Sequence, residues 1–182
     1  MGDCMRKQFA GLVGWVLLAS VAGVGLKAAG APPNVELLMP FVLSAGLAGG
    51  PVAGFLVGLS TRAAYDVYLG WAGWWTLLTA PSYAIAGLFI GYVGLKRKAL
   101  GRWEMALLAG AATIVYDVVS MLAFGLPFGI PLLNLVVGQI PFSIAHVGGN
   151  MLFCFLIAPT LATALRQFIS EEKVAVGAPV GV

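Results

Sequence analysis

The chain is a succession of apolar segments, separated by short breaks that contain glycine, proline or basic residues. A helix needs about 20 apolar residues to cross the hydrocarbon core of a bilayer. Only 9% of the residues are charged and 60% are hydrophobic, whereas about a quarter of a soluble domain is charged. A single soluble core of this size cannot hide so much apolar surface. The sequence therefore predicts an integral membrane protein, and helices satisfy their own backbone polar groups in lipid.

We expect a single all-α membrane domain over residues 1–182, with six transmembrane helices and both termini cytoplasmic. The expected helices cover approximately residues 9–29, 35–48, 52–69, 74–95, 103–124 and 139–168. The second segment is short and contains Pro40, so whether it fully spans the membrane is left open. Gly49, Gly50 and Pro51 form the break before the third segment. Residues 170–182 are expected to form a flexible tail.

The basic residues set the orientation of this bundle. With six spans, one side of the membrane holds Arg6, Lys7, Lys96, Arg97, Lys98, Arg102, Arg166 and Lys173. The other side holds only Lys27, and Arg62 lies within a segment. Lys and Arg are enriched in cytoplasmic loops. The asymmetry predicts a multi-pass protein of the cell membrane with its termini inside.

Charged residues within membrane segments are costly, and each is a candidate functional residue. Asp66 follows Arg62 by four positions, so the two can pair on one helical face. This pair could hold helices together without contacting a ligand. Asp117 could face Arg62 or a water-filled site. Asp66 and Asp117 could also serve as the acid and base of a membrane enzyme.

Aromatic residues gather between the third and fourth segments, namely Tyr65, Tyr68, Trp71, Trp74 and Trp75. They could form an aromatic belt at the membrane interface, or a wall on which a flat ligand stacks. The triplet Tyr65-Asp66-Val67 recurs as Tyr116-Asp117-Val118, which is compatible with a duplication or with chance.

Polar residues at two further places are binding candidates. Asn34 and Glu36 open the second segment, where capping and a favourable acid in the first turn would explain both without a ligand. A polar stripe in the last segment consists of Gln139, Ser143, His146 and Asn150. It points into the protein, either to bond another helix or to meet a ligand.

The candidate substrate-binding residues are therefore Asn34, Glu36, Tyr65, Asp66, Trp75, Asp117, His146 and Asn150. No catalytic motif, phosphate loop, metal-ligand spacing or basic nucleic-acid stripe is found in the sequence. We thus expect no catalytic residue, no cofactor, no metal and no nucleic-acid partner. Ala10 and Gly14, and likewise Ala19 and Gly23, are small residues four apart that allow another helix to pack closely. That helix could belong to a partner protein or to this chain.

The layout resembles the substrate-binding S components of energy-coupling factor (ECF) transporters. The resemblance rests on residues 34–36, 50–58, Asp66, 75–78, 140–146, Asn150 and Pro159, and it covers about residues 34–167. It implies six helices that bind a water-soluble vitamin or vitamin precursor on the outer side. It also implies a transmembrane T subunit and two ATPase subunits as partners, which carry the ATP chemistry. In several members the first helix meets the T subunit through an Ala-x-x-x-Ala pattern, which here takes the form of Ala-Gly pairs.

Three functions remain open at this point. The first is a substrate-capturing subunit, whose acidic and aromatic outer groups suit a planar molecule that is hydrogen-bonding or cationic. The second is a membrane enzyme that uses Asp66 and Asp117. The third is a structural membrane subunit without a ligand.

Overall fold

Five α-helices and no strand are found in a computed structural model that describes residues 2–32, 34–97 and 99–175. They are α1 (Gly2–Ala28), α2 (Met39–Tyr68), α3 (Trp74–Lys96), α4 (Arg102–Gly125) and α5 (Leu132–Ala175). Each contains a stretch long and apolar enough to cross a bilayer. The chain is thus all-helical, and its helices indicate a multi-pass membrane protein.

The expected number of six helices is not matched, because α2 covers both the second and the third predicted segment. The two parts meet at Gly50, whose φ of 81° and ψ of −171° lie outside the helical region. Glycine adopts such a positive φ at little cost. Pro51 follows, and its fixed φ suits the first turn of a helix.

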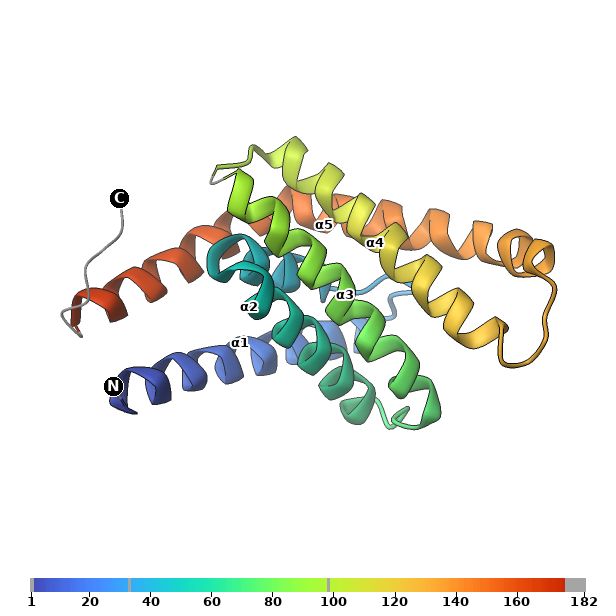
Figure 1. Cartoon of the computed structure of the whole chain (residues 1–182), viewed down its shortest axis with the longest axis horizontal. Helices are drawn as coiled ribbons and strands as arrows, with labels where there is room; N and C mark the ends of the chain where they lie inside the picture. Colours follow the sequence, from blue (N-terminus) through green and yellow to red (C-terminus); the bar gives the residue numbers. More distant parts are fainter. Residues whose placement is uncertain (1, 33, 98, 176–182) are drawn as a thin grey trace.

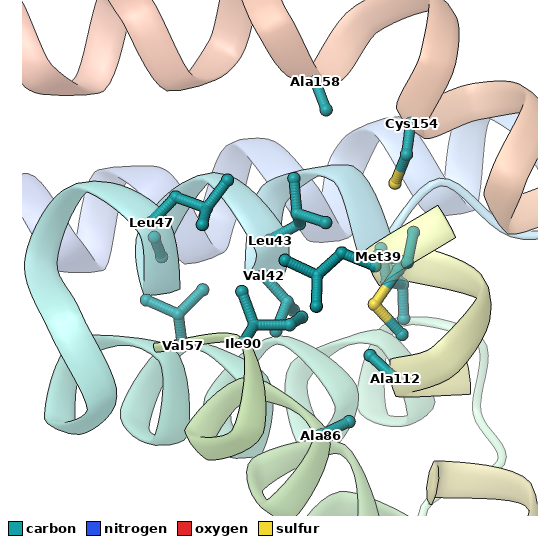
Figure 2. Close-up of a cluster of buried hydrophobic side chains, with 14 of the residues drawn as sticks. Met39, Val42, Leu43, Leu47, Val57, Ala86, Ile90, Ala112, Cys154 and Ala158 are labelled. Atoms are coloured by element: carbon teal, nitrogen blue, oxygen red, sulfur yellow. The ribbon is translucent and has the colours of Figure 1, made fainter. Parts of the chain in front are cut away.

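The chain doubles back at Gly50. A Cβ atom placed on Gly54 would lie 3.1 Å from the Cα atom of Gly46, eight residues earlier, and Figure 2 shows Leu47 and Val57 on the two sides of the turn. Residues 39–49 extend only about 16 Å at the helical rise per residue, roughly half of a ~30 Å hydrocarbon core. The first part of α2 is too short to cross the membrane.

This reversal places the start of α1 and the end of α5 at the same end of the bundle (Figure 1). The connection between α3 and α4 lies toward that end too. α5 begins at Leu132, before the predicted residue 139, and it remains helical through residues 170–175 of the expected tail. Residues 176–182 lie outside the described part of the chain.

The core lies between the two parts of α2 and the helices α3, α4 and α5 (Figure 2). Its labelled members are Met39, Val42, Leu43, Leu47, Val57, Ala86, Ile90, Ala112, Cys154 and Ala158. Cys154 is fully buried there and packs as a small apolar side chain.

Glycines bring α2 and α3 into backbone contact, which explains part of the high glycine content. A side chain at Gly54 would overlap the carbonyl oxygen of Gly87, and a side chain at Gly87 would overlap that of Gly54. Gly91 meets the backbone of Pro51 in the same way. Small residues at helix interfaces in membranes allow this close approach.

The two small-residue pairs of α1 lie in different surroundings. Ala19 is fully buried, and a side chain at Gly23 would meet Leu38 and Tyr65, so this pair packs within the chain. Ala10 is exposed, and nothing lies within 4 Å of a Cβ atom at Gly14. Of the two pairs, only the surface around Ala10 and Gly14 is available to a partner helix.

Candidate ligand-binding cavity

Glu36 lies in the loop between α1 and α2, not in a helix. α2 begins at Met39, with Leu38 as its N-cap residue and Pro40 in its first turn. Asn34 has a φ of 67°, in the left-handed region that asparagine tolerates better than most residues. The capping explanation for Asn34 and Glu36 is therefore wrong, because both residues precede the helix. The loop instead directs Glu36 into the protein, where it is 5% exposed.

Three helices supply partners to the Glu36 carboxylate. Its Oε2 atom lies 3.0 Å from the Arg62 guanidinium of α2. Its Oε1 atom accepts a 3.0 Å hydrogen bond from the Tyr83 hydroxyl of α3 and lies 3.2 Å from Nε2 of His146 in α5. Burial alone would raise the pKa of Glu36, but the Arg62 charge and the bonds with His146 and Tyr83 outweigh it and hold the pKa at about 2.

Arg62 also pairs with Asp66, as their spacing predicts. The guanidinium lies 3.0 Å from Oδ1 of Asp66, and the Thr76 hydroxyl donates a 2.7 Å hydrogen bond to Oδ2. Asp66 is fully buried and is not among the residues that line the cavity described below. Its role in this geometry is to hold Arg62 and to join α2 to the first turn of α3.

Asp117 pairs with α5 and not with Arg62. Its Oδ1 atom lies 2.8 Å from Nδ1 of His146, and its Oδ2 atom accepts a 2.6 Å hydrogen bond from Ser143. Gln139 donates to Ser143 in turn. His146 thus lies between the carboxylates of Glu36 and Asp117, and an imidazolium ring can donate to both. The network fixes α4 against α5 and connects both to the loop that carries Glu36.

These groups form the deep end of a cavity of about 280 Å³. Its lining residues are Lys27, Ala31, Asn34, Glu36, Arg62, Tyr65, Trp71, Trp75, Tyr116, Phe142 and His146. Glu36, Arg62 and His146 are buried, whereas Trp71 and Trp75 are exposed. The cavity therefore has a charged floor, aromatic walls and an opening beside the loops that follow α1 and α2.

The structure brings five of the eight predicted binding residues to this cavity, namely Asn34, Glu36, Tyr65, Trp75 and His146. Asp66 and Asp117 lie behind the floor and bond its members. Asn150 does not line the cavity, and its amide donates a 3.0 Å hydrogen bond to Thr113. The polar stripe of α5 thus has two roles. His146 lines the cavity, whereas Ser143 and Asn150 form hydrogen bonds to α4.

Several lining residues were not among the predicted ones. Tyr116 and Phe142 lie in apolar segments without a distinguishing motif, although the repeated Tyr-Asp-Val triplet pairs Tyr116 with the predicted Tyr65. Lys27 could have been found as the lone basic residue on the side expected to face outward. Arg62 is a charged candidate that the sequence pairs with Asp66 or Asp117, but it is not among the eight predicted binding residues.

The tryptophans of this region lie in different surroundings. Trp71 and Trp75 line the cavity. Trp74 stacks on Phe124, with ring centroids 5.6 Å apart and planes inclined by 19°, and it also meets Phe128. Trp75 also meets Trp74 and Phe124, with ring centroids 6.2 Å and 5.6 Å away, so this aromatic cluster continues into the cavity wall.

Among the described residues, no group of three or more His, Cys, Asp or Glu side chains is placed to hold a metal ion. The cavity offers charges, hydroxyls and aromatic rings. Its chemistry suits a small polar molecule that has a flat apolar part.

Comparison with known proteins gives partial similarities. No protein-family model matches the sequence and no solved structure matches the chain. A UPF0397 protein of Lactococcus lactis subsp. cremoris strain NZ9000 is 31% identical over 93 residues, which are 50% of this chain and 48% of the relative. A UPF0397 protein of Streptococcus pneumoniae serotype 19F strain G54 is 32% identical over 111 residues, 59% of this chain and 58% of the relative. The chain thus spans about half the length of these relatives, and their name states no activity, substrate or partner.

Proposed function

We propose that this chain is the substrate-capturing membrane subunit of an ECF-type importer. It binds a water-soluble vitamin or vitamin precursor from the outer side of the cell membrane. The cavity carries this proposal, because its charged floor and aromatic walls open at one end of a helical membrane bundle. Ligand sites are typically concave and mostly apolar, with a few convergent polar groups.

The placement of basic residues supports an outward-facing cavity. Lys96 and Arg97 end α3, Arg102 begins α4, and Arg166 lies near the end of α5. The cavity instead lies where α1 and α2 end and α3 begins, at the opposite ends of these helices. A cytoplasmic location of the basic end, as the positive-inside rule predicts, leaves the cavity open to the outside.

An importer of this type needs partners, because this sequence has no nucleotide-binding motif. The proposed partners are a transmembrane T subunit and two ATPase subunits. The exposed part of α1 around Ala10 and Gly14 is a surface on which a partner helix could pack closely.

The two other functions find less support in the geometry. A membrane enzyme would need Asp66 or Asp117 to reach its substrate, but neither lines the cavity and each is bonded to other side chains. A structural subunit would explain the Arg62–Asp66 pair. It would leave the cavity itself without a role.

The proposal is tested by identifying and transporting the natural ligand. The protein is expressed in a vitamin-rich medium and purified in mild detergent, and the small molecules released on denaturation are identified by mass spectrometry. The identified molecule is then assayed for ATP-dependent uptake into proteoliposomes with and without T and ATPase subunits. We expect submicromolar binding by this chain alone and uptake only with the partners. Chemical conversion of the molecule by this chain alone, or failure of uptake with all partners present, would contradict the proposal.

Replacing Trp75 by alanine is expected to weaken binding of that molecule about five- to 150-fold. Trp75 lines the cavity, and removing an aromatic side chain on which a flat nucleic-acid base stacks costs about 1–3 kcal/mol. Isothermal titration calorimetry measures the change. Trp103→Ala is the matched control, because Trp103 is exposed at the start of α4 and packs on Phe155. Equal losses in the two variants would show that Trp75 does not contact the ligand.

A further inference from the structure

Two buried hydrogen-bond donors at the cavity have no partner among the described residues. They are Nε of Arg62 and the hydroxyl of Tyr65, and both residues line the cavity. Leaving a buried donor unpaired is costly, because it has lost its bond to water without gaining another. A ligand that supplies an acceptor to these groups would recover that cost. The two residues lie three positions apart on α2, about one helical turn.

The acidic groups around the cavity are already committed to other donors. Glu36 is the only carboxylate among the described residues that line the cavity, and both of its oxygens are bonded, to Arg62 and to Tyr83 and His146. Asp66 and Asp117 lie behind this floor. No carboxylate of the described lining is left to pair with a cation on a ligand.

A further positive charge stands near the opening. Lys27 lines the cavity, and its ammonium donates a 2.6 Å hydrogen bond to the carbonyl oxygen of Pro32. An ammonium has three N–H groups, so Lys27 has others to offer. The side chains that face a ligand thus combine unpaired donors with a surplus of positive charge.

We infer that the cavity selects a planar aromatic molecule that carries a carboxylate. The carboxylate accepts hydrogen bonds from Arg62 and Tyr65 near Lys27, and the ring lies against Trp71 and Trp75. A dianionic phosphate is less suitable, because the ionised Glu36 lies in the same floor. A cationic molecule is disfavoured, since it would meet two positive side chains and no available acid. This inference rests on the proposed function, whose substrate it narrows.

Three probes with one bicyclic ring test the charge preference: indole-3-acetate, indole-3-acetamide and tryptamine, which are anionic, neutral and cationic. Each is titrated into the full chain in nanodiscs and followed by calorimetry. We expect indole-3-acetate to bind in the millimolar range or tighter, and at least tenfold tighter than tryptamine. Equal affinities, tighter binding of tryptamine, or no measurable binding of indole-3-acetate would each overturn the inference.

Three variants assign the preference to named side chains. Lys27→Gln is expected to lose more affinity for indole-3-acetate than for indole-3-acetamide, because it removes a charge. Lys27→Arg keeps the positive charge and should restore the tighter binding of indole-3-acetate relative to indole-3-acetamide. Tyr65→Phe is expected to weaken both probes, because it removes a hydroxyl that either acceptor can use. Thermal unfolding of each variant checks that the fold is retained. If Lys27→Gln leaves the ratio of the affinities for indole-3-acetate and indole-3-acetamide unchanged, the role given to this lysine is overturned.

The inference and the proposed function can fail separately. A cationic vitamin that is bound and imported with the partner subunits would keep the importer and overturn the carboxylate preference. Selective binding of indole-3-acetate together with failed uptake of the natural ligand would support the carboxylate preference and contradict the importer function.

Discussion

Replacing Arg62 by methionine is expected to lower the free energy of unfolding by about 3–5 kcal/mol, as found when one partner of a buried ion pair is removed. Arg62 is 8% exposed and lies 3.0 Å from both Glu36 and Asp66. Methionine fills much of the same space but leaves two buried carboxylates without their cation. Thermal or denaturant unfolding in detergent, followed by circular dichroism, measures the loss.

The matched control is Arg97→Met. Arg97 pairs with Glu104, but both side chains are substantially exposed, and exposed pairs contribute about 0–1 kcal/mol. If Arg97→Met lowers the free energy of unfolding as much as Arg62→Met does, burial does not explain the importance of the Arg62 ion pairs.

A second variant keeps the prediction testable if Arg62→Met does not fold. Adding Glu36→Gln and Asp66→Asn removes the two stranded charges while keeping polar side chains of similar size. We expect this triple variant to regain part of the lost stability, because removing an entire buried ion pair is often less costly than breaking it. A triple variant less stable than Arg62→Met would show that the carboxylates stabilise the fold independently of Arg62.

The membrane character and the Arg62–Asp66 pair could be predicted because both depend on local sequence. Apolar segment length decides whether a helix can cross the bilayer, and a spacing of four decides which side chains share a helical face. Local sequence also located the break at Gly49, Gly50 and Pro51. The six-helix hypothesis also implied that the chain reverses there, but it left open whether residues 35–48 span the membrane.

The environment of Glu36 could not be predicted from local sequence. Asn34 and Glu36 match the residue preferences of a helix start, but Pro40 marks the first turn of α2 and moves the start to Met39. Once Glu36 belongs to a loop, its partners come from three helices distant in sequence. The same holds for Asp117, whose partners Ser143 and His146 lie on α5.

Replacing Gly54 by alanine is expected to cost about 3 kcal/mol of unfolding free energy, at the upper end of the usual range for overpacking. The added methyl group would overlap the carbonyl oxygen of Gly87. A backbone atom cannot rotate away as a side chain can, so α2 and α3 must separate. Unfolding in detergent measures the loss.

Gly148→Ala is the matched control, because Gly148 also lies within a helix and nothing lies within 4 Å of its Cβ position. There alanine is expected to be neutral or to stabilise by about 0.5–1 kcal/mol, through its better helix propensity. Similar losses at both positions would contradict the importance of the α2–α3 contact.

The effect of Gly54→Ala should extend to ligand binding. Arg62 and Tyr65 lie on α2, whereas Trp75 lies on α3, and all three line the cavity. Tyr83 of α3 also bonds Glu36, the partner of Arg62. A wider separation of the two helices would pull the aromatic wall away from the charged floor.

We therefore expect Gly54→Ala to weaken ligand binding even under conditions where the variant is fully folded, and Gly148→Ala to leave ligand binding unchanged. Full affinity in folded Gly54→Ala would show that the glycine contact sets stability alone and does not position the cavity.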